Sequence, residues 1–313
     1  MVQENKLIYI DFCKKVDMSI FSQPWWLDAV CGKDNWNVSI VEKGGNIFAT
    51  MPYYIENKLG FSIIKNPKLT QTMGIYFNYP KNQKYYKKLS FEKEMIDKLL
   101  MQLPKFDSIS MSFNYNYSNL LPFYWHGFKS SVSYTYIIDN IPLEELEEKF
   151  KTDVRRRRRK AEKLGVIVYE DTNIEDIYRL SKMTFERQGI NIPYSFNLAK
   201  NIYSIATKHN SCKMFFAKYD NEVIAAIFLI YDNNSVYYIM GGIDPDKKNL
   251  GAMDLLQHES IKFAIKSNRI YNFEGSMIES IEKYFRSFGS IQKPYYQIKK
   301  TNSKLLKLRE CLK

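Results

Sequence analysis

The sequence predicts an α/β protein, of the α+β kind, in which two similar units follow each other along the chain. Hydrophobic residues make up 45% of the 313 residues and aromatic residues 15%, which is enough to bury large cores. Strand-like apolar runs alternate with helix-like segments. The same order of predicted elements also occurs twice, and such an internal repeat indicates a fold built from two similar units. We expect each unit to be a mixed, mostly antiparallel sheet flanked by helices.

The first half begins with a helix-like segment and a β-hairpin over residues 37–55, whose two apolar runs are separated by a turn at 43–46. A central strand follows a further helix at 106–114. An aromatic-rich helical turn, a Gly-containing turn and a Tyr-rich strand then occupy 120–138.

The second half repeats this order. A hairpin at 213–231 has its turn at 219–222, a central strand lies at 269–277, and a short helix, turn and Tyr-rich strand occupy 280–298. The seam lies near 132–141, so the predicted units are 1–132 and 133–298. A helix-like segment within 299–313 is expected to pack back on the first unit.

The stretch KTDVRRRRRKAEKLGV, residues 151–166, lies in a predicted helix at the start of the second unit. Phe150, Val154 and Ala161 fall on one helical stripe, and Arg157 lies at its centre. An inward guanidinium needs a carboxylate, carbonyls or a phosphate, so Arg157 is either paired within the fold or bound to a ligand. The outward arginines are solvated or contact phosphates. They are Arg155, Arg156 and Arg159.

The formal net charge of +12 favours an anionic partner, unless it only reflects an AT-rich genome. Neither the four cysteines nor the three histidines have metal-ligand spacing, so we expect no metal site and no Ser-His-Asp hydrolase. The start of the sequence carries acidic residues and no long apolar core, so we expect it not to act as a signal peptide, and no apolar run reaches the ~20 residues that a membrane span needs. We expect a reduced, cytoplasmic protein with at most peripheral membrane contact.

Four stretches resemble one family. They are SIFSQPWWLDAV (19–30), followed by MPYY and KLTQTMG, then RRRRRKAEKLGVIV (155–168), MTFERQGINIPYS (183–195) and NFEGSMIESIEKYFRSFGS (272–290). Together they resemble the FemAB-like acyltransferases, tandem units of the GNAT acetyltransferase superfamily. The last stretch is the most specific, because it is similar to the family's strand, Gly-Ser turn and Phe-basic-x-Phe-Gly segment. The match looks closest to the acetyltransferase members found near surface-polysaccharide genes.

The resemblance implies an N-acyltransferase whose second unit is catalytic. Its acceptor would be an amine of a cell-envelope or surface-polysaccharide precursor, either a phosphorylated small molecule or a lipid-linked sugar. The donor would be an acyl-coenzyme A, as a co-substrate, or an aminoacyl-tRNA as in the peptidoglycan enzymes. The alternative from another class is a tRNA- or RNA-binding module without catalysis.

Acyl transfer to an amine needs a proton acceptor and a stabiliser of the tetrahedral oxyanion. Arg286 matches the basic position of the family segment, where lysine is usual, and by resemblance would stabilise negative charge. Glu274 ends a predicted central strand, where α/β sheets place ligands, and could accept the amine proton. It could instead form an ion pair with Arg286.

The expected substrate-binding residues come from the same resemblance. Arg187 and Gln188 match a position that would contact phosphates of the acceptor, and Trp25 and Trp26 match an aromatic position of the first unit. The other expected substrate-binding residues are Gln71, Gly74, Arg157, Ser276, Phe285 and Tyr296.

The donor site is the least complete match. Coenzyme A users of the superfamily carry a Gln/Arg-x-x-Gly-x-Gly/Ala loop whose backbone amides hold the diphosphate at a helix N-terminus. The equivalent stretch is DKKNLGAMDLL, in which Lys248 and Met253 replace two motif residues. The expected cofactor-binding residues are Lys248, Asn249, Gly251 and Ala252. Because half the motif is missing, an aminoacyl-tRNA end remains the alternative donor.

Overall fold

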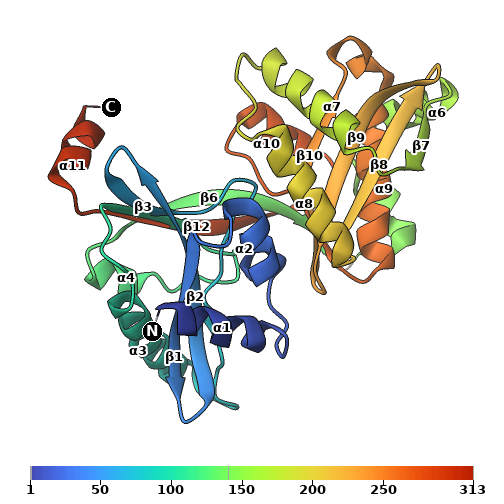
Figure 1. Ribbon diagram of the computed structural model, residues 1–313. Coiled ribbons are helices and arrows are strands. Elements are labelled where there is room, and N and C mark those ends of the chain that lie inside the picture. The colour runs from blue at the N-terminus through green and yellow to red at the C-terminus, as the bar shows by residue number, and fades with distance from the viewer. Residues whose placement is uncertain (1, 140, 313) are drawn as a thin grey trace. The chain divides into compact units, whose positions relative to one another are not determined.

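The computed structural model describes residues 2–139 and 141–312, with the side chains of 2, 3 and 311 left out. The chain forms two compact units (Figure 1). Unit 1 comprises Met1–Ser133 and Pro294–Lys313, and unit 2 comprises Tyr134–Lys293. Each unit is a mixed sheet flanked by helices, which confirms the predicted fold class.

The sheet of unit 1 has the strand order β1-β2-β3-β5-β12, and β4 pairs with β2. Only the pair β3 and β5 is parallel. The strands are β1 (Trp36–Lys43), β2 (Asn46–Lys58), β3 (Phe61–Lys65), β4 (Tyr76–Phe77), β5 (Ser108–Ser112) and β12 (Ile291–Thr301). The helices are α1 (Val2–Cys13), η1 (Ile20–Ser22), α2 (Pro24–Cys31), α3 (Tyr85–Met101), α4 (Leu121–Trp125) and α11 (Lys304–Cys311).

The sheet of unit 2 has the order β6-β11-β10-β9-β8-β7, in which only β10 and β11 are parallel. The strands are β6 (Lys129–Ile138), β7 (Ile167–Glu170), β8 (Cys212–Tyr219), β9 (Glu222–Tyr231), β10 (Ser235–Ile243) and β11 (Ile270–Asn272). The helices are η2 (Leu143–Glu145), α5 (Leu146–Lys149), α6 (Thr152–Lys163), α7 (Ile174–Arg187), α8 (Phe196–Lys208), η3 (Pro245–Leu250), α9 (Ala252–Lys266) and α10 (Glu279–Arg286).

Both predicted hairpins are confirmed. Strands β1 and β2 are joined by Gly44 and Gly45, and strands β8 and β9 by Asp220 and Asn221. All four turn residues have positive φ, between 52° and 76°, as both central residues of a type I′ hairpin turn require. Glycine, asparagine and aspartate tolerate this conformation best, so the turns follow directly from the local sequence.

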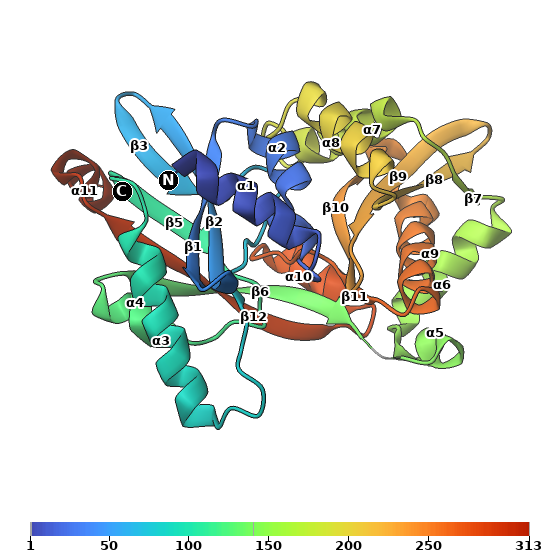
Figure 2. The ribbon, with the colours of Figure 1, turned by 60° about the horizontal axis from the view of Figure 1, so that its bottom comes forward.

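The core of unit 2 lies on both faces of its central strands. Residues 224–230 of β9 are all buried, since α7 and α8 cover one face of the sheet and α9 covers the other (Figure 2). Helix α6 packs on α9 through Val154 and Ala161, which are fully buried as the helical stripe predicts.

The two units exchange their last strands, which the tandem repeat did not predict. Strand β6 follows α4 of unit 1, but Ile137 and Ile138 pair with β11 of unit 2. Strand β12 follows α10 of unit 2, but residues 297–301 pair with β5 of unit 1. The sequence assigned residues 294–298 to the second unit, whereas in the structure they group with unit 1, in which residues 297 and 298 pair with β5.

Candidate active site

The candidate site of unit 2 lies where the parallel strands β10 and β11 part. Their register covers three residue pairs, from Ser235↔Ile270 to Tyr237↔Asn272. Strand β11 ends there, while β10 continues to Ile243. None of the described strands pairs with this side of β10 beyond Tyr237. Its backbone polar groups are therefore available to a ligand at the carboxyl end of β11.

A tight turn follows β11. The buried Asn272 side chain accepts hydrogen bonds from the Thr135 hydroxyl (2.6 Å) and from the backbone N–H of Glu274 (2.9 Å). Glu274 and Gly275 have φ of 60° and 69°. A Cβ at Gly275 would lie 2.3 Å from the Tyr134 carbonyl oxygen, so only glycine fits. The predicted strand 269–277 therefore ends early, and Glu274 is held in a strained conformation.

Burial raises the pKa of Glu274 to about 8. The preceding Phe273 belongs to an aromatic cluster, with ring centroids 4.8 Å from Phe285 and 5.8 Å from Phe288. The Glu274 carboxyl makes no hydrogen bond or ion pair with any other described side chain. A carboxyl with this pKa can accept and return a proton near neutral pH.

Arg286, the last residue of α10, is paired within its own helix. Its Nε lies 2.9 Å from an Oε of Glu282, and its side chain is 55% exposed. The Tyr136 hydroxyl donates to the same carboxylate at 3.0 Å, and the Gln292 amide donates to Tyr136 at 2.5 Å. The alternative of an ion pair between Arg286 and Glu274 is not what the structure shows.

Two further predicted residues flank this turn. The Ser276 hydroxyl accepts the backbone N–H of Ile278 at 3.0 Å, so it stabilises the loop into α10. Phe285 is 6% exposed and its ring packs on Phe273, so it is part of the core.

Helix α6 and the start of α9 are joined by Arg157 and Asp254. The guanidinium donates to both carboxylate oxygens, at 2.9 and 2.8 Å. Burial raises the pKa of Asp254, and Arg157 opposes that shift. Of the two alternatives for Arg157, pairing within the fold is therefore what the structure shows. The backbones also touch, since a Cβ at Gly251 would lie 2.3 Å from the Arg157 carbonyl oxygen.

The start of α9 does not fit the diphosphate of a coenzyme A. Gly251 and Ala252 are buried beneath α6, and a carboxylate already occupies the first turn of the helix. Lys248 and Asn249 are exposed, and the Asn249 carbonyl accepts a hydrogen bond from Lys160 at 3.1 Å.

The arginine run has a second inward member, Arg158, which the sequence analysis missed. Its side chain is 11% exposed and forms an ion pair with Glu147 of α5. It also donates to the ring of His258 on α9, at 3.1 Å. The overlooked signal is its i+4 spacing from the buried Val154. Near the outer surface, Arg156 pairs with Asp153, Arg155 donates to Thr152, and Arg159 is exposed.

The other predicted residues lie elsewhere. Arg187 ends α7 and is exposed, and the Gln188 amide donates to the Thr184 carbonyl at 3.2 Å. In unit 1, Trp26 is fully buried with Nε1 bonded to Thr70 at 3.0 Å, while Trp25 is half-buried beside it.

Three more residues of unit 1 make backbone contacts there. The Gln71 carbonyl accepts from Asn66, the Gly74 N–H donates to Ser22, and the Tyr296 carbonyl accepts from Phe113.

Within the described part of the chain, no group of three or more His, Cys, Asp or Glu side chains is arranged to hold a metal ion. The cysteines with described side chains, Cys13, Cys31 and Cys212, are free thiols. Among the described helices, none combines the length and the apolar character that a membrane crossing requires.

Comparison with known proteins identifies the domain and the fold to which this chain is similar. Residues 148–274 match the family model described as "Acetyltransferase (GNAT) domain". No curated protein matches the chain. The structure of FemX is similar over 94% of this chain and 95% of its own, with a TM-score of 0.65 and 13% identity.

Two further structures are similar. L-PGS from Bacillus licheniformis matches over 89% of this chain and 88% of its own, with a TM-score of 0.54 and 10% identity. A tandem GNAT protein from the clavulanic acid biosynthesis pathway matches over 96% and 95%, with a TM-score of 0.51 and 6% identity. The chain thus has a FemAB-like, GNAT-superfamily fold, and the acetyltransferase domain matched in its second unit makes it an acyltransferase.

Proposed function

We propose that this protein transfers an acyl or aminoacyl group to an amine of a phosphorylated or lipid-linked cell-envelope precursor, with Glu274 as the base. The observation that carries the proposal is the Glu274 carboxyl, which has no hydrogen-bond or ion-pair partner among the described side chains. Its pKa is raised to about 8, and it lies where β11 ends beside β10. A structural carboxylate would be paired. The raised pKa of Glu274 instead suits a group that accepts a proton near neutral pH.

The proposed step is an aminolysis. The neutral amine of the acceptor attacks the carbonyl carbon of the activated donor, so a C–N bond forms. The Glu274 carboxylate takes the proton that the attacking nitrogen loses. When the tetrahedral intermediate collapses, the bond to the donor's leaving group breaks, and Glu274 returns the proton to that group.

The oxyanion of the intermediate needs hydrogen-bond donors. The free side of β10 after Tyr237 offers backbone N–H groups. Arg286 lies on α10, directly after the Glu274 turn, and its side chain is more than half exposed despite the pair with Glu282. We assign it to charge stabilisation during turnover, which agrees with its place in the family segment.

The start of α9 bears on the choice of acyl donor. GNAT domains in general use acyl-coenzyme A. Because the α9 start is filled, an aminoacyl-tRNA is the donor favoured here. The exposed Arg156 and Arg159 on α6 would contact its phosphates.

Helix α11 supports a lipid-linked acceptor. Leu305 and Leu308 are 68% and 61% exposed on one side of this short helix, among Lys304, Lys307 and Arg309. Exposed leucines flanked by basic residues fit the surface of an anionic membrane.

The test uses purified full-length protein with a charged tRNA pool or acetyl-coenzyme A as donor and UDP-amino sugars or lipid-linked amino sugars as acceptors. Amide formation is followed by mass spectrometry. The proposal expects product with wild type and at least about a hundredfold less with Glu274→Gln. Full activity of Glu274→Gln would refute the assignment of the base. Salt-sensitive tRNA binding without any turnover would favour the non-catalytic RNA-binding alternative.

A further inference from the structure

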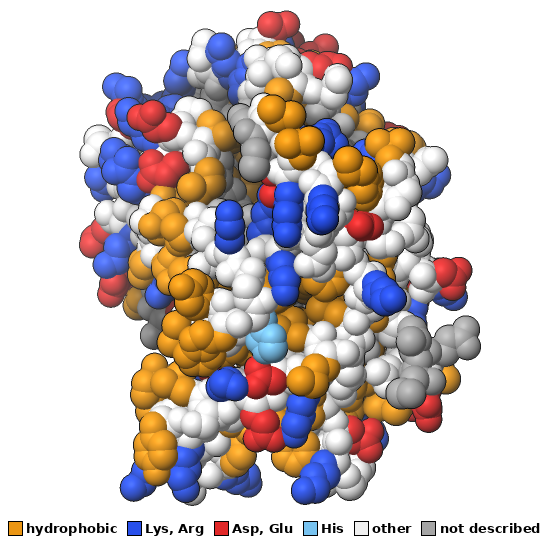
Figure 3. Space-filling view, turned by 90° about the vertical axis from the view of Figure 1, so that its left-hand side faces the viewer, with side chains coloured by type: hydrophobic (Ala, Val, Ile, Leu, Met, Phe, Trp, Pro, Cys, Tyr) orange, Lys and Arg blue, Asp and Glu red, His pale blue; other side chains and the backbone are white. Residues whose placement is uncertain are grey.

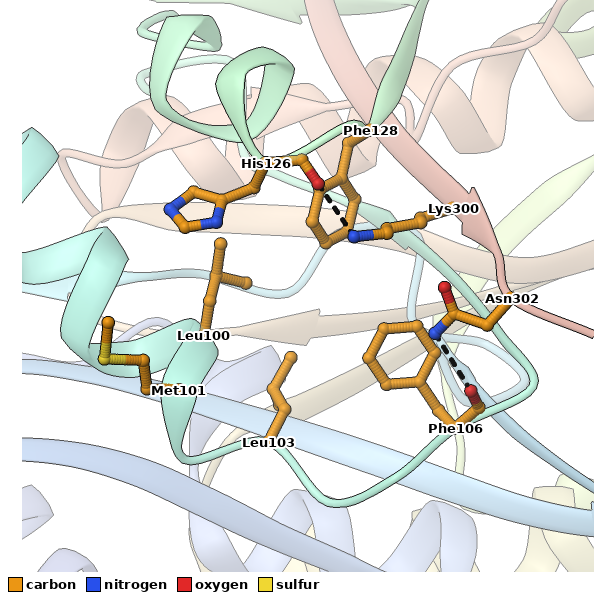
Figure 4. Close-up of a pocket in the computed structure, with 8 residues that line it drawn as sticks. All are labelled: Leu100, Met101, Leu103, Phe106, His126, Phe128, Lys300 and Asn302. Atoms are coloured by element: carbon orange, nitrogen blue, oxygen red, sulfur yellow. Dashed lines mark hydrogen bonds between the residues drawn. The ribbon is translucent and has the colours of Figure 1, made fainter.

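Unit 1 contains a cavity of about 260 Å³, and every residue that lines it belongs to that unit (Figure 4). It lies among the end of α3, the loop before β5, the turn between α4 and β6, and the end of β12. The lining residues are Leu100, Met101, Leu103, Phe106, His126, Phe128, Lys300 and Asn302. None of these residues takes part in the proposed acyl transfer.

The walls of the cavity are mostly apolar. Leu100, Leu103 and Phe106 are only partly buried, and Met101 at the rim is 79% exposed. The fold therefore leaves apolar surface open to this space. The volume equals roughly nine water molecules at ~30 Å³ each, so it suits a small organic molecule or a short acyl chain.

One side of the cavity is cationic. The Lys300 ammonium donates to the His126 carbonyl at 2.8 Å and lies 5.4 Å from the centroid of the Phe128 ring. Lys300 forms no ion pair with any carboxylate among the described residues. An ammonium has three donors, so a cation here still has hydrogen bonds to give to an anion.

The carboxylate that contacts the lining residue His126 is already paired with a lysine. Asp97 lies 2.8 Å from Nε2 of His126 and 2.7 Å from the Lys93 ammonium. In Figure 4, Lys300 and Asn302 lie on one side of the cavity, across from Leu100 and Met101. The Asn302 amide is engaged with the Phe106 carbonyl at 3.1 Å. Lys300 is thus the group that would select the charge of a ligand.

We propose that this cavity is a second binding site, which takes a small amphipathic anion: an apolar chain or ring among Leu100, Leu103 and Phe106, and a carboxylate on Lys300. An apolar body in an apolar pocket gives affinity, and one charge-assisted hydrogen bond gives specificity. This site is independent of the donor and acceptor of the acyl transfer.

Octanoate is the probe, with octylamine and octan-1-ol as matched ligands that change only the head group. Binding to the full-length protein is measured by titration calorimetry at low salt. Lys300→Met removes the cation, and Lys299→Met is its control, because neighbouring residues of a strand point to opposite faces. Leu103→Trp fills the cavity, and Leu100→Trp replaces it if the first variant does not fold.

The proposal expects octanoate to bind with one site, octylamine to bind at least about tenfold more weakly, and octanol to lie between them. Lys300→Met should weaken octanoate about tenfold and leave octanol unchanged, and the cavity-filling variant should abolish both. Absent octanoate binding, equal binding of octylamine, or equal effects of Lys299→Met and Lys300→Met would overturn it. Because the readout is binding alone, its failure leaves the proposed acyl transfer untouched.

Discussion

Asp254 is a buried and Glu274 a partly buried carboxyl group in the same unit, and burial raises the pKa of each. Their surroundings differ. The Asp254 carboxylate accepts two hydrogen bonds from the Arg157 guanidinium, whereas the Glu274 carboxyl has no partner among the side chains that the structure describes. Asp254 joins α6 to α9 and is part of the architecture. Glu274 costs the fold free energy when it ionises, and such a cost is typical of groups kept for function.

The same contrast applies to the two glycines beside them. Gly251 and Gly275 both have positive φ, and both let another backbone approach to 2.3 Å from the place of a Cβ. At Gly251 the approaching helix covers the helix start and removes it as an anion site. At Gly275 the approaching strand β6 sets the turn that presents Glu274. A glycine at such a position thus indicates close backbone packing. The elements around it decide whether a ligand can bind there.

The largest effect is expected from removing the unpaired carboxyl. Glu274→Gln should lower kcat/KM by about 10² or more, because the amide cannot accept the proton. The matched control is Glu279→Gln, an exposed residue at the start of α10, which should keep wild-type activity. Similar losses in both variants would mean that α10 and its loop are merely disturbed.

The pH dependence of stability sharpens the comparison. The folded-state pKa of Glu274, about 8, lies above its ordinary value of 4.5, so its contribution is fully present below pH 4.5 and is lost as pH rises towards 8. The free energy of unfolding of wild type minus that of Glu274→Gln should fall by up to about 1.4 kcal/mol per pH unit in this window. Urea unfolding from pH 5 to 8 measures it. A flat difference would show that Glu274 is solvated.

Breaking the paired carboxyl should destabilise the fold. Arg157→Ala leaves Asp254 buried without its partner and should cost about 2 kcal/mol, which is less than for a fully buried pair because the Arg157 side chain is 39% exposed. Arg156→Ala, one position away and 79% exposed, should change stability by less than about 0.5 kcal/mol. Equal effects of the two would contradict a structural role for the Arg157 pair.

The smallest effect on stability is expected at Arg286. Its ion pair with Glu282 is exposed, so Arg286→Ala should change the free energy of unfolding by less than about 0.5 kcal/mol. Turnover should fall about tenfold if the guanidinium stabilises the oxyanion. Unchanged turnover would leave Arg286 as a surface residue of α10.

The sequence predicted the parts of the fold that local chemistry decides. The hairpins follow from Gly44-Gly45 and Asp220-Asn221, and the inward position of Arg157 follows from helical spacing. The partner of Arg157 lies 97 residues away, and no local pattern identifies it. The exchange of β6 and β12 was also missed. Tertiary packing decides which strands pair, and the sequence repeat is the same whether a strand pairs within its own repeat or with the other one.

The candidate site divides in the same way. Glu274 was found from its place after a strand, but its raised pKa depends on burial that only the packed structure reveals. Phe285 and Trp26 were expected near a substrate, and both are buried in their cores. The residue type alone does not show whether a large aromatic side chain lines a cleft or packs in a core.

The most direct test of the account is the pKa of Glu274 itself. The protein is labelled with ¹³C at glutamate side-chain carboxyl carbons, and the Glu274 resonance is assigned as the one missing in Glu274→Gln. A titration from pH 3 to 10 then follows its chemical shift. The account predicts a midpoint near 8. A midpoint near the ordinary glutamate value of 4.5 would contradict it, since Glu274 would then be one more solvated carboxylate.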